Sequence, residues 1–231
     1  MDSLTTHDLI AIVWLLGLWG GYALYADNPR QGGRSLMGVM HEHRKRWMKQ
    51  MLGRENRMVD ANIIGTVMRS VSLFATTTIF IVGGLIAVLG SVGKAQAVVS
   101  AFPFAVEASA VLWEIKIIAL IFIYIYAFFK FAWSLRQFNY CVVFVGVAPA
   151  IGEGDETSQS VFIARAASVI SLAVHSYNQG LRAYYFGLAT LAWFVHPGLF
   201  MVATLWVVLV LYRREFRSRM VKALSGEEVL L

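Results

Sequence analysis

Long apolar stretches set the architecture expected of this chain. Residues 9–26 and 71–92 contain no charged side chain, and a third stretch covers about 111–133, bracketed by Trp113 and Trp133. About 20 helical residues are needed to cross a hydrocarbon core of about 30 Å. The pattern predicts an all-α fold, a polytopic membrane helix bundle.

A fourth uncharged run covers residues 183–212 and is too long for one untilted span but short for two. His196-Pro197-Gly198 lies near its middle, and proline breaks a helix while proline and glycine favour turns. We therefore predict two short segments, about 180–196 and 198–212, that either span the membrane or form a re-entrant pair. The alternative is one tilted helix with a proline kink.

Two segments between the spans combine charged residues with apolar residues at helical spacing. They cover about 35–69 and 158–180, and we predict that they are cytoplasmic helices leading into the second and fourth spans. Gly53 weakens the first pattern without ending it. Residues 134–150 are expected to continue the third helix until Pro149. All of these segments belong to one membrane domain, residues 1–231.

Composition agrees with a membrane protein. Hydrophobic residues make up 58% of the chain, charged residues 15%, and the mean hydropathy is +0.63. The net charge is +6, but the basic residues lie in blocks beside the apolar runs. This placement favours anionic lipid over nucleic acid, so the expected partner is the bilayer. The single cysteine, Cys141, excludes an intrachain disulfide.

The distribution of Lys and Arg predicts the topology. No basic residue precedes the first apolar run, so we expect no cleavable signal and an external N-terminus. Nine basic residues lie in 27–70, two in 93–116, four in 130–182 and five in 213–222. Five crossings place eighteen of the twenty inside, whereas four crossings place thirteen inside. The positive-inside rule thus predicts five spans with a cytoplasmic C-terminus. The membrane we expect is the bacterial inner membrane.

Polar residues at membrane depth form the candidate pathway or gate. They are Asn62, Arg69, Thr76, Thr77, Thr78, Glu114, Lys116, Asn178 and Arg182. One interpretation is an anion-tolerant pathway lined by the two arginines and the threonines, in which the arginines bind an anion or hold a cytoplasmic gate through acidic residues at 153–156. This role is favoured for Arg182 over Arg69. The other is structural, with hydroxyls bonded to their own helices and arginines reaching lipid phosphates. The similar sequences around Arg69 and Arg182 suggest a weak internal repeat or a chance similarity.

Gly17 and Gly21 form a G-x-x-x-G pair in the first apolar run, which allows a neighbouring backbone to approach closely. We expect this helix–helix contact to support self-association, although packing within one chain would explain the pair equally well.

No enzyme motif is present: the chain has no phosphate-binding glycine loop, no dinucleotide fingerprint, no H-E-x-x-H and no G-x-S-x-G. His41-Glu42-His43 is flanked by basic residues, which disfavours a metal ion. We predict no enzyme, no metal and no cofactor; a haem held by His175 or His196 alone is the remaining alternative. The favoured function is a homo-oligomeric channel- or transporter-like protein. The alternative is a non-catalytic scaffold or accessory subunit of a larger membrane complex.

Three motifs carry a family resemblance: SLRQFNYC at 134–141, NQGLRAYYF at 178–186 and LYRREFRSR at 211–219. They resemble an uncharacterised family of bacterial and plant multi-span membrane proteins, a domain of unknown function. The resemblance implies a single membrane domain along nearly the whole chain and no particular activity.

Overall fold

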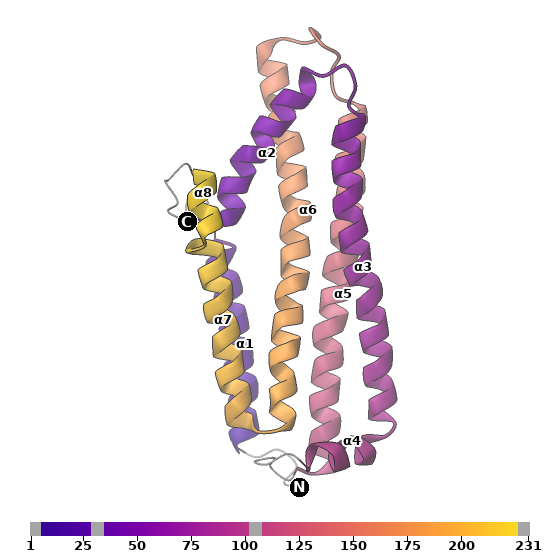
Figure 1. Ribbon diagram of the computed structural model, residues 1–231, viewed down its shortest axis with the longest axis vertical. Coiled ribbons are helices and arrows are strands. Elements are labelled where there is room, and N and C mark those ends of the chain that lie inside the picture. The colour runs from indigo at the N-terminus through magenta and orange to yellow at the C-terminus, as the bar shows by residue number, and fades with distance from the viewer. Residues whose placement is uncertain (1–5, 29–34, 102–107, 226–231) are drawn as a thin grey trace. The chain divides into compact units, whose positions relative to one another are not determined.

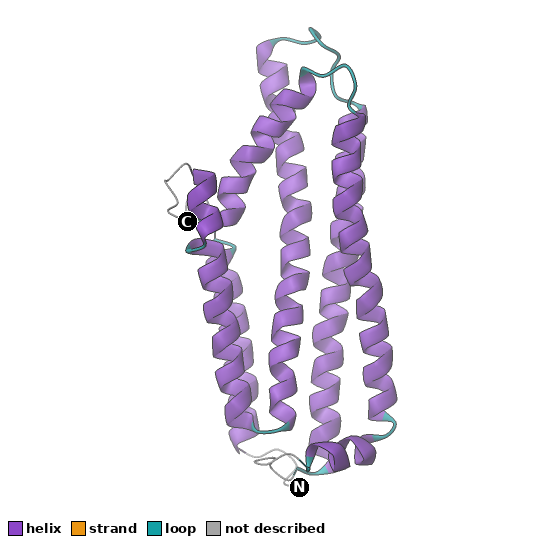
Figure 2. Ribbon diagram, viewed as in Figure 1, coloured by secondary structure: helices purple, strands orange, loops and turns teal. Residues whose placement is uncertain are grey.

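The computed structural model describes residues 6–28, 35–101 and 108–225. All regular structure in these ranges is helical, which confirms the all-α prediction (Figures 1 and 2). The elements are α1 (Thr6–Ala26), α2 (Leu36–Leu52), α3 (Met58–Leu89), α4 (Val92–Val99), α5 (Ala110–Gly146), α6 (Glu156–Leu191), the 3-10 turn η2 (Ala192–Phe194), α7 (Pro197–Phe216) and α8 (Arg219–Ser225).

Four helical segments are long and apolar enough to cross a membrane: Thr6–Ala26, Met58–Leu89, Ala110–Gly146 and Glu156–Phe194. Large apolar side chains cover their outer surfaces, including Val13, Leu24, Phe80 and Phe122, which are 66–80% exposed. An apolar exterior of this kind fits lipid rather than water. At 1.5 Å per residue, α3, α5 and α6 each exceed about 45 Å and extend beyond a hydrocarbon core of about 30 Å.

The chain forms two compact units, which we describe separately. Unit 1 contains residues 1–28, 77–128 and 181–214, and unit 2 contains residues 29–76, 129–180 and 215–231. Helices α3, α5 and α6 each contribute one part to each unit.

In unit 1, α1 lies beside α7 and beside the last part of α6 (Figure 1). The Trp14 indole donates to the Met201 carbonyl at 3.2 Å, and the Tyr25 and Tyr212 rings lie 6.1 Å apart. Both pairs are separated by 187 residues, so α1 and α7 run parallel. Trp19 stacks on Phe186 of α6 at 5.1 Å between ring centroids.

The apolar run 183–212 forms two antiparallel helices rather than one kinked helix. Arg214 near the end of α7 donates to the Tyr185 hydroxyl on α6 at 2.7 Å. On one continuous helix these residues would be about 43 Å apart. The break falls between Leu191 and Pro197, where the 3-10 turn η2 leads into α7. The proline takes the first helical position, where its missing N–H costs no hydrogen bond.

In unit 2, α5 and α6 are packed closely through a glycine. A Cβ built on Gly180 of α6 would lie 2.5 Å from the ring of Phe131 on α5. Phe131 is fully buried and also packs against Phe74 of α3 and Tyr177 of α6. Ser134 of α5 donates to the carbonyl of Ala173 of α6 at 2.7 Å, which joins the same pair of helices.

The helix expected to run through Gly53 ends there instead. The Gly53 N–H donates to the carbonyl of Gln50 at 3.2 Å and the Arg54 N–H to that of Met51 at 3.1 Å, which closes α2. Asn56 accepts from the Met58 N–H at 2.9 Å, which opens α3. The prediction of one continuous helix was wrong at this position.

Asp60 at the start of α3 fixes the turn between α2 and α3. It is fully buried and accepts hydrogen bonds from the Trp47 indole and the Arg54 guanidinium, both at 2.6 Å. A buried carboxylate is stable only when such donors surround it. In the same unit α2 packs against α8, and the Met37 N–H donates to Glu215 at 3.1 Å.

Ser171 of α6 binds two basic side chains of α2. Its hydroxyl donates to the Ala167 carbonyl at 2.8 Å, so it accepts from His41 Nδ1 at 2.8 Å and from Arg44 at 3.2 Å. Burial and, after it, the positive charge of Lys45 lower the pKa of His41 below its usual value.

We predict that Gly180→Ala destabilises the protein by about 1–3 kcal/mol, because the buried ring of Phe131 cannot move away from the added methyl group. Gly83→Ala on α3 is the matched control, since a Cβ there meets no atom within 4 Å. It should be neutral or stabilising by up to about 1 kcal/mol. Thermal unfolding in detergent measures both; equal midpoints for the two variants would contradict the close packing.

We predict that His41 makes unit 2 less stable in acid. Because its pKa is lower in the folded than in the unfolded protein, the unfolded state binds more protons between the two values. Stability should therefore decline as the pH falls below about 6.5 and level off below the folded pKa. His41→Gln, which keeps a polar side chain without titrating, should flatten this part of the profile. A profile unchanged by the substitution would refute the assignment.

Candidate functional site

A buried ion pair lies at one end of unit 1. Asp8 on α1 is 2% exposed and Lys116 on α5 is 3% exposed, and Lys116 Nζ lies 3.9 Å from an Asp8 oxygen. Trp193 of η2 joins them: its indole donates to Asp8 at 2.8 Å, and its carbonyl accepts from Lys116 at 2.9 Å. We call Asp8, Lys116 and Trp193 the outer cluster; the names outer and inner used below follow the topology predicted from the sequence.

Trp193 is held in place by its own packing. It is 1% exposed and stacks on Phe200 of α7 at 5.3 Å, and Lys116 lies 5.3 Å from its ring centroid. Because Trp193 lies in the short η2 turn, its indole contacts Asp8 while its backbone carbonyl contacts Lys116. Buried ions need such additional hydrogen bonds, because their attraction alone does not offset the loss of hydration.

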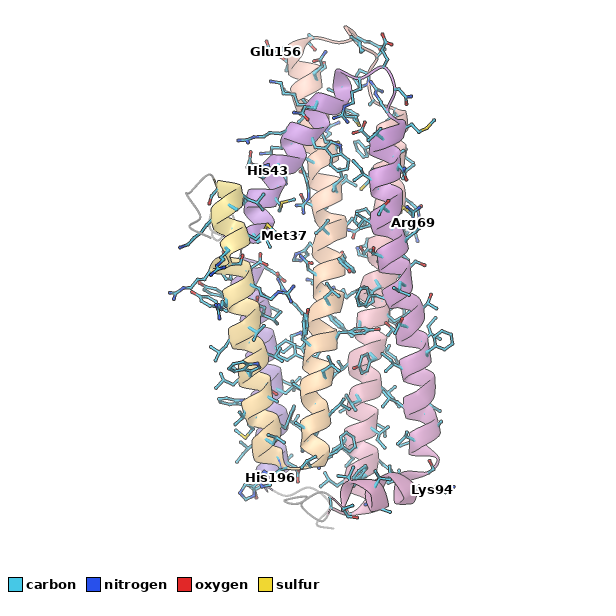
Figure 3. All side chains as sticks on the ribbon, in the orientation of Figure 1. Met37, His43, Arg69, Lys94, Glu156 and His196 are labelled. Atoms are coloured by element: carbon cyan, nitrogen blue, oxygen red, sulfur yellow. The ribbon has the colours of Figure 1, made fainter. Side chains whose placement is uncertain are left out.

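The outer cluster borders a cavity of about 330 Å³. Most of its wall is apolar, and its polar lining consists of His7, Asp8, Lys116 and His196. His196, labelled in Figure 3, accepts from the Gly198 N–H through Nδ1 at 2.9 Å. This bond leaves Nε2 as the protonated nitrogen of the neutral ring. Cavities of this size with a few polar groups are typical of small-molecule sites.

A second ion pair lies at the other end of α1. Arg182 of α6 is 7% exposed and donates to Asp27 at 2.7 Å. Its guanidinium also lies over the Tyr22 ring, 5.3 Å from the centroid. We call Arg182, Asp27 and Tyr22 the inner cluster.

The two clusters are separated by the length of α1. From Asp8 to the end of the helix at Ala26 is about 27 Å, close to the thickness of a hydrocarbon core. The charges therefore lie where each end of an apolar span would meet the membrane boundary.

Hydroxyl groups lie between the charged ends of unit 1. Thr78 of α3 is fully buried and bonds to the Tyr184 hydroxyl at 2.7 Å. Tyr124 of α5 packs edge-on against Tyr184 at 5.2 Å, and a Cβ on Gly187 would lie 2.9 Å from the Tyr124 ring. Glycine at 187 thus makes room for this buried tyrosine.

The structure separates the polar residues singled out from the sequence. Arg182, Lys116 and Thr78 are buried in unit 1, whereas Glu114 and Thr77 of the same unit are exposed.

The remaining residues of that group belong to unit 2. Arg69 is exposed and donates to Thr66 on its own helix at 2.8 Å (Figure 3). Asn62 and Thr76 are also exposed, and Asn178 is half-buried with its amide 3.7 Å from the sulfur of Met37. Arg69 and Arg182 therefore belong to different units and have different surroundings.

Gly17 and Gly21 are exposed on α1, and a Cβ at either meets no described atom within 4 Å. The described part of the chain therefore does not use this pair for its own helix packing.

Sequence reasoning did not identify Asp8 and Asp27 as partners of Lys116 and Arg182. The sequence does contain a signal for this pairing. Asp8 and Asp27 flank the first apolar run, while Lys116 and Arg182 lie at the ends of two other apolar runs.

Comparison with known proteins places the chain in a family. It belongs to the family described as protein of unknown function, DUF599, whose profile matches residues 10–220. This confirms the resemblance to an uncharacterised family. No curated protein and no solved structure matches the chain.

We predict that Arg182→Met destabilises the protein by about 3 kcal/mol, because it leaves the Asp27 carboxylate without its buried partner. Arg182→Lys should recover part of this loss, since lysine keeps the charge but not the planar guanidinium over Tyr22. Arg69→Met, at an exposed arginine, should stay within about 0.5 kcal/mol of the wild type. Thermal unfolding in detergent ranks the three variants, and an Arg182→Met protein as stable as Arg69→Met would exclude the pairing.

Proposed function

We propose that the protein is a channel- or transporter-like membrane protein that moves a small solute through unit 1. The observation that supports it most is the buried Asp8–Lys116 pair beside a cavity of about 330 Å³. Ionisable side chains within spanning helices are costly and commonly mark solute or ion pathways.

The two ion pairs suit the role of gates. Each joins an end of α1 to another helix, so breaking the pair at one end would free that end of α1 while the other stays attached. Alternating access requires this kind of independent opening around a fixed site. The hydroxyl groups of Thr78, Tyr124 and Tyr184 lie between the two ends and could contact a passing solute.

Self-association is part of the proposal. Four long apolar segments leave little room for a wide pore in one protomer, and the uncovered glycine pair Gly17 and Gly21 offers a surface for a second copy.

The charges of unit 1 support an orientation. Because α1 and α7 run parallel, Asp27, Arg182, Arg213 and Arg214 lie at the same end of the unit. The positive-inside rule makes this end cytoplasmic. The outer cluster then faces the outside of a cell membrane, which in a bacterium is the inner membrane, and the C-terminus is cytoplasmic.

Flux measurements test the proposal. Proteoliposomes containing the full chain are exposed to gradients of small organic anions, amines and neutral solutes, and the currents or tracer uptake are compared with protein-free liposomes. We expect one solute class to move, and Lys116→Met to reduce its flux at least tenfold. Lys94→Met, at an exposed lysine of unit 1, is the matched control and should keep wild-type flux.

Two results would overturn the proposal: no solute moving faster than in protein-free liposomes, or equal flux for Lys116→Met and the wild type. Stoichiometric co-purification with a different membrane subunit in the first case would instead favour the accessory-subunit alternative.

A further inference from the structure

We infer that the cavity beside the outer cluster binds a small monocarboxylate with an apolar body, held by Lys116 and His196. This inference rests on the proposed function and names its substrate class.

The ammonium group of Lys116 has N–H donors that no described residue accepts from. An ammonium group carries three N–H donors. Among the described residues it donates to the Trp193 carbonyl alone, because the 3.9 Å to Asp8 is too long for a hydrogen bond. At 3% exposure, water on the open surface does not supply the missing acceptors. An acceptor within the cavity would satisfy them.

The charge of the cluster selects a monoanion. Asp8 already supplies one carboxylate to Lys116, attached to the end of α1. If a solute carboxylate replaces Asp8 beside Lys116 and the end of α1 moves away with Asp8, the site again holds one positive and one negative charge. A phosphate dianion would bring a second negative charge that the cluster does not balance, which in a dry site is costly.

His196 provides a second donor. Its Nδ1 accepts from the Gly198 N–H, so Nε2 carries the proton of the neutral ring, and the residue lines the same cavity. One carboxylate has two oxygens, which Lys116 and His196 can bind together. His196 directly precedes α7, and Met201 of α7 lines the same cavity, so a bound solute would contact both α5 and α7.

The walls of the cavity select the rest of the solute. Ile10, Leu112, Val195 and Met201 supply an apolar lining. The cavity volume of about 330 Å³ lies at the lower end of the range of about 300–1,000 Å³ that is typical of ligand pockets. A short hydrocarbon chain or a single aromatic ring fits these walls, and benzoate is therefore a suitable probe.

Binding of such a solute would compete with Asp8 for Lys116. If Asp8 and Lys116 only stabilised the fold, Asp8→Asn would not tighten solute binding; competition predicts that it does. Asp8→Asn removes the competing carboxylate and keeps the hydrogen-bonding oxygen for Trp193, so benzoate should bind more tightly. Lys116→Met removes the cation and should weaken binding at least tenfold.

The test is calorimetric titration of the full-length protein in detergent with benzoate, with the neutral benzamide and the cationic benzylamine as comparisons. We expect saturable benzoate binding at least tenfold tighter than that of either comparison. Asp8→Asn should tighten it several-fold, His196→Ala should weaken it several-fold, and Lys94→Met should leave it unchanged. If Lys116→Met alone does not fold, the Asp8→Asn, Lys116→Met double variant is compared with Asp8→Asn.

The outcomes separate the site from the function. Equal binding of benzoate and benzamide, or weaker benzoate binding by Asp8→Asn, overturns the carboxylate site. Benzoate binding with the expected pattern of variants supports it, whatever the flux. If benzoate and the other solutes then fail to cross proteoliposomes, the site stands and the proposed transport function falls.

Discussion

Charges cannot be left alone in the apolar part of unit 1, and this constraint organises the unit. Hydrocarbon offers no water to a buried ion, so each charge must find its partner within the protein. Lys116 and Arg182 come from α5 and α6, and both partners, Asp8 and Asp27, come from the ends of α1. The first helix is thereby tied to the bundle at two places about 27 Å apart.

The helix packing follows from the same constraint. The Trp193 indole and carbonyl bind Asp8 and Lys116 from the short η2 turn that follows α6. The chain then reverses at Pro197 into α7, whose Phe200 covers Trp193. Trp193 thus stabilises the ion pair at the place where the last apolar run divides.

Much of the helical architecture could be predicted from the sequence, because long uncharged runs and blocks of basic residues are local signals. The division of the run at 183–212 followed from Pro197, and the importance of Lys116 and Arg182 from their charge. The end of α2 at Gly53 was missed, because it depends on Asp60 and its donors Trp47 and Arg54, which meet only in the folded chain. Asp8 and Asp27 were missed as partners for the same reason.

The difference between Arg69 and Arg182 shows what a motif alone leaves undecided. Both follow an asparagine and a glycine at the start of an apolar stretch, yet Arg69 is exposed and bonds to its own helix, while Arg182 is buried against Asp27 and Tyr22. The cost of a charge is set by the solvent it can reach, not by its neighbours in sequence. A buried arginine paired with an aspartate across two helices couples their positions, whereas an exposed one does not. Among the described contacts of the two arginines, those of Arg182 therefore link α1 to α6, whereas that of Arg69 stays within α3.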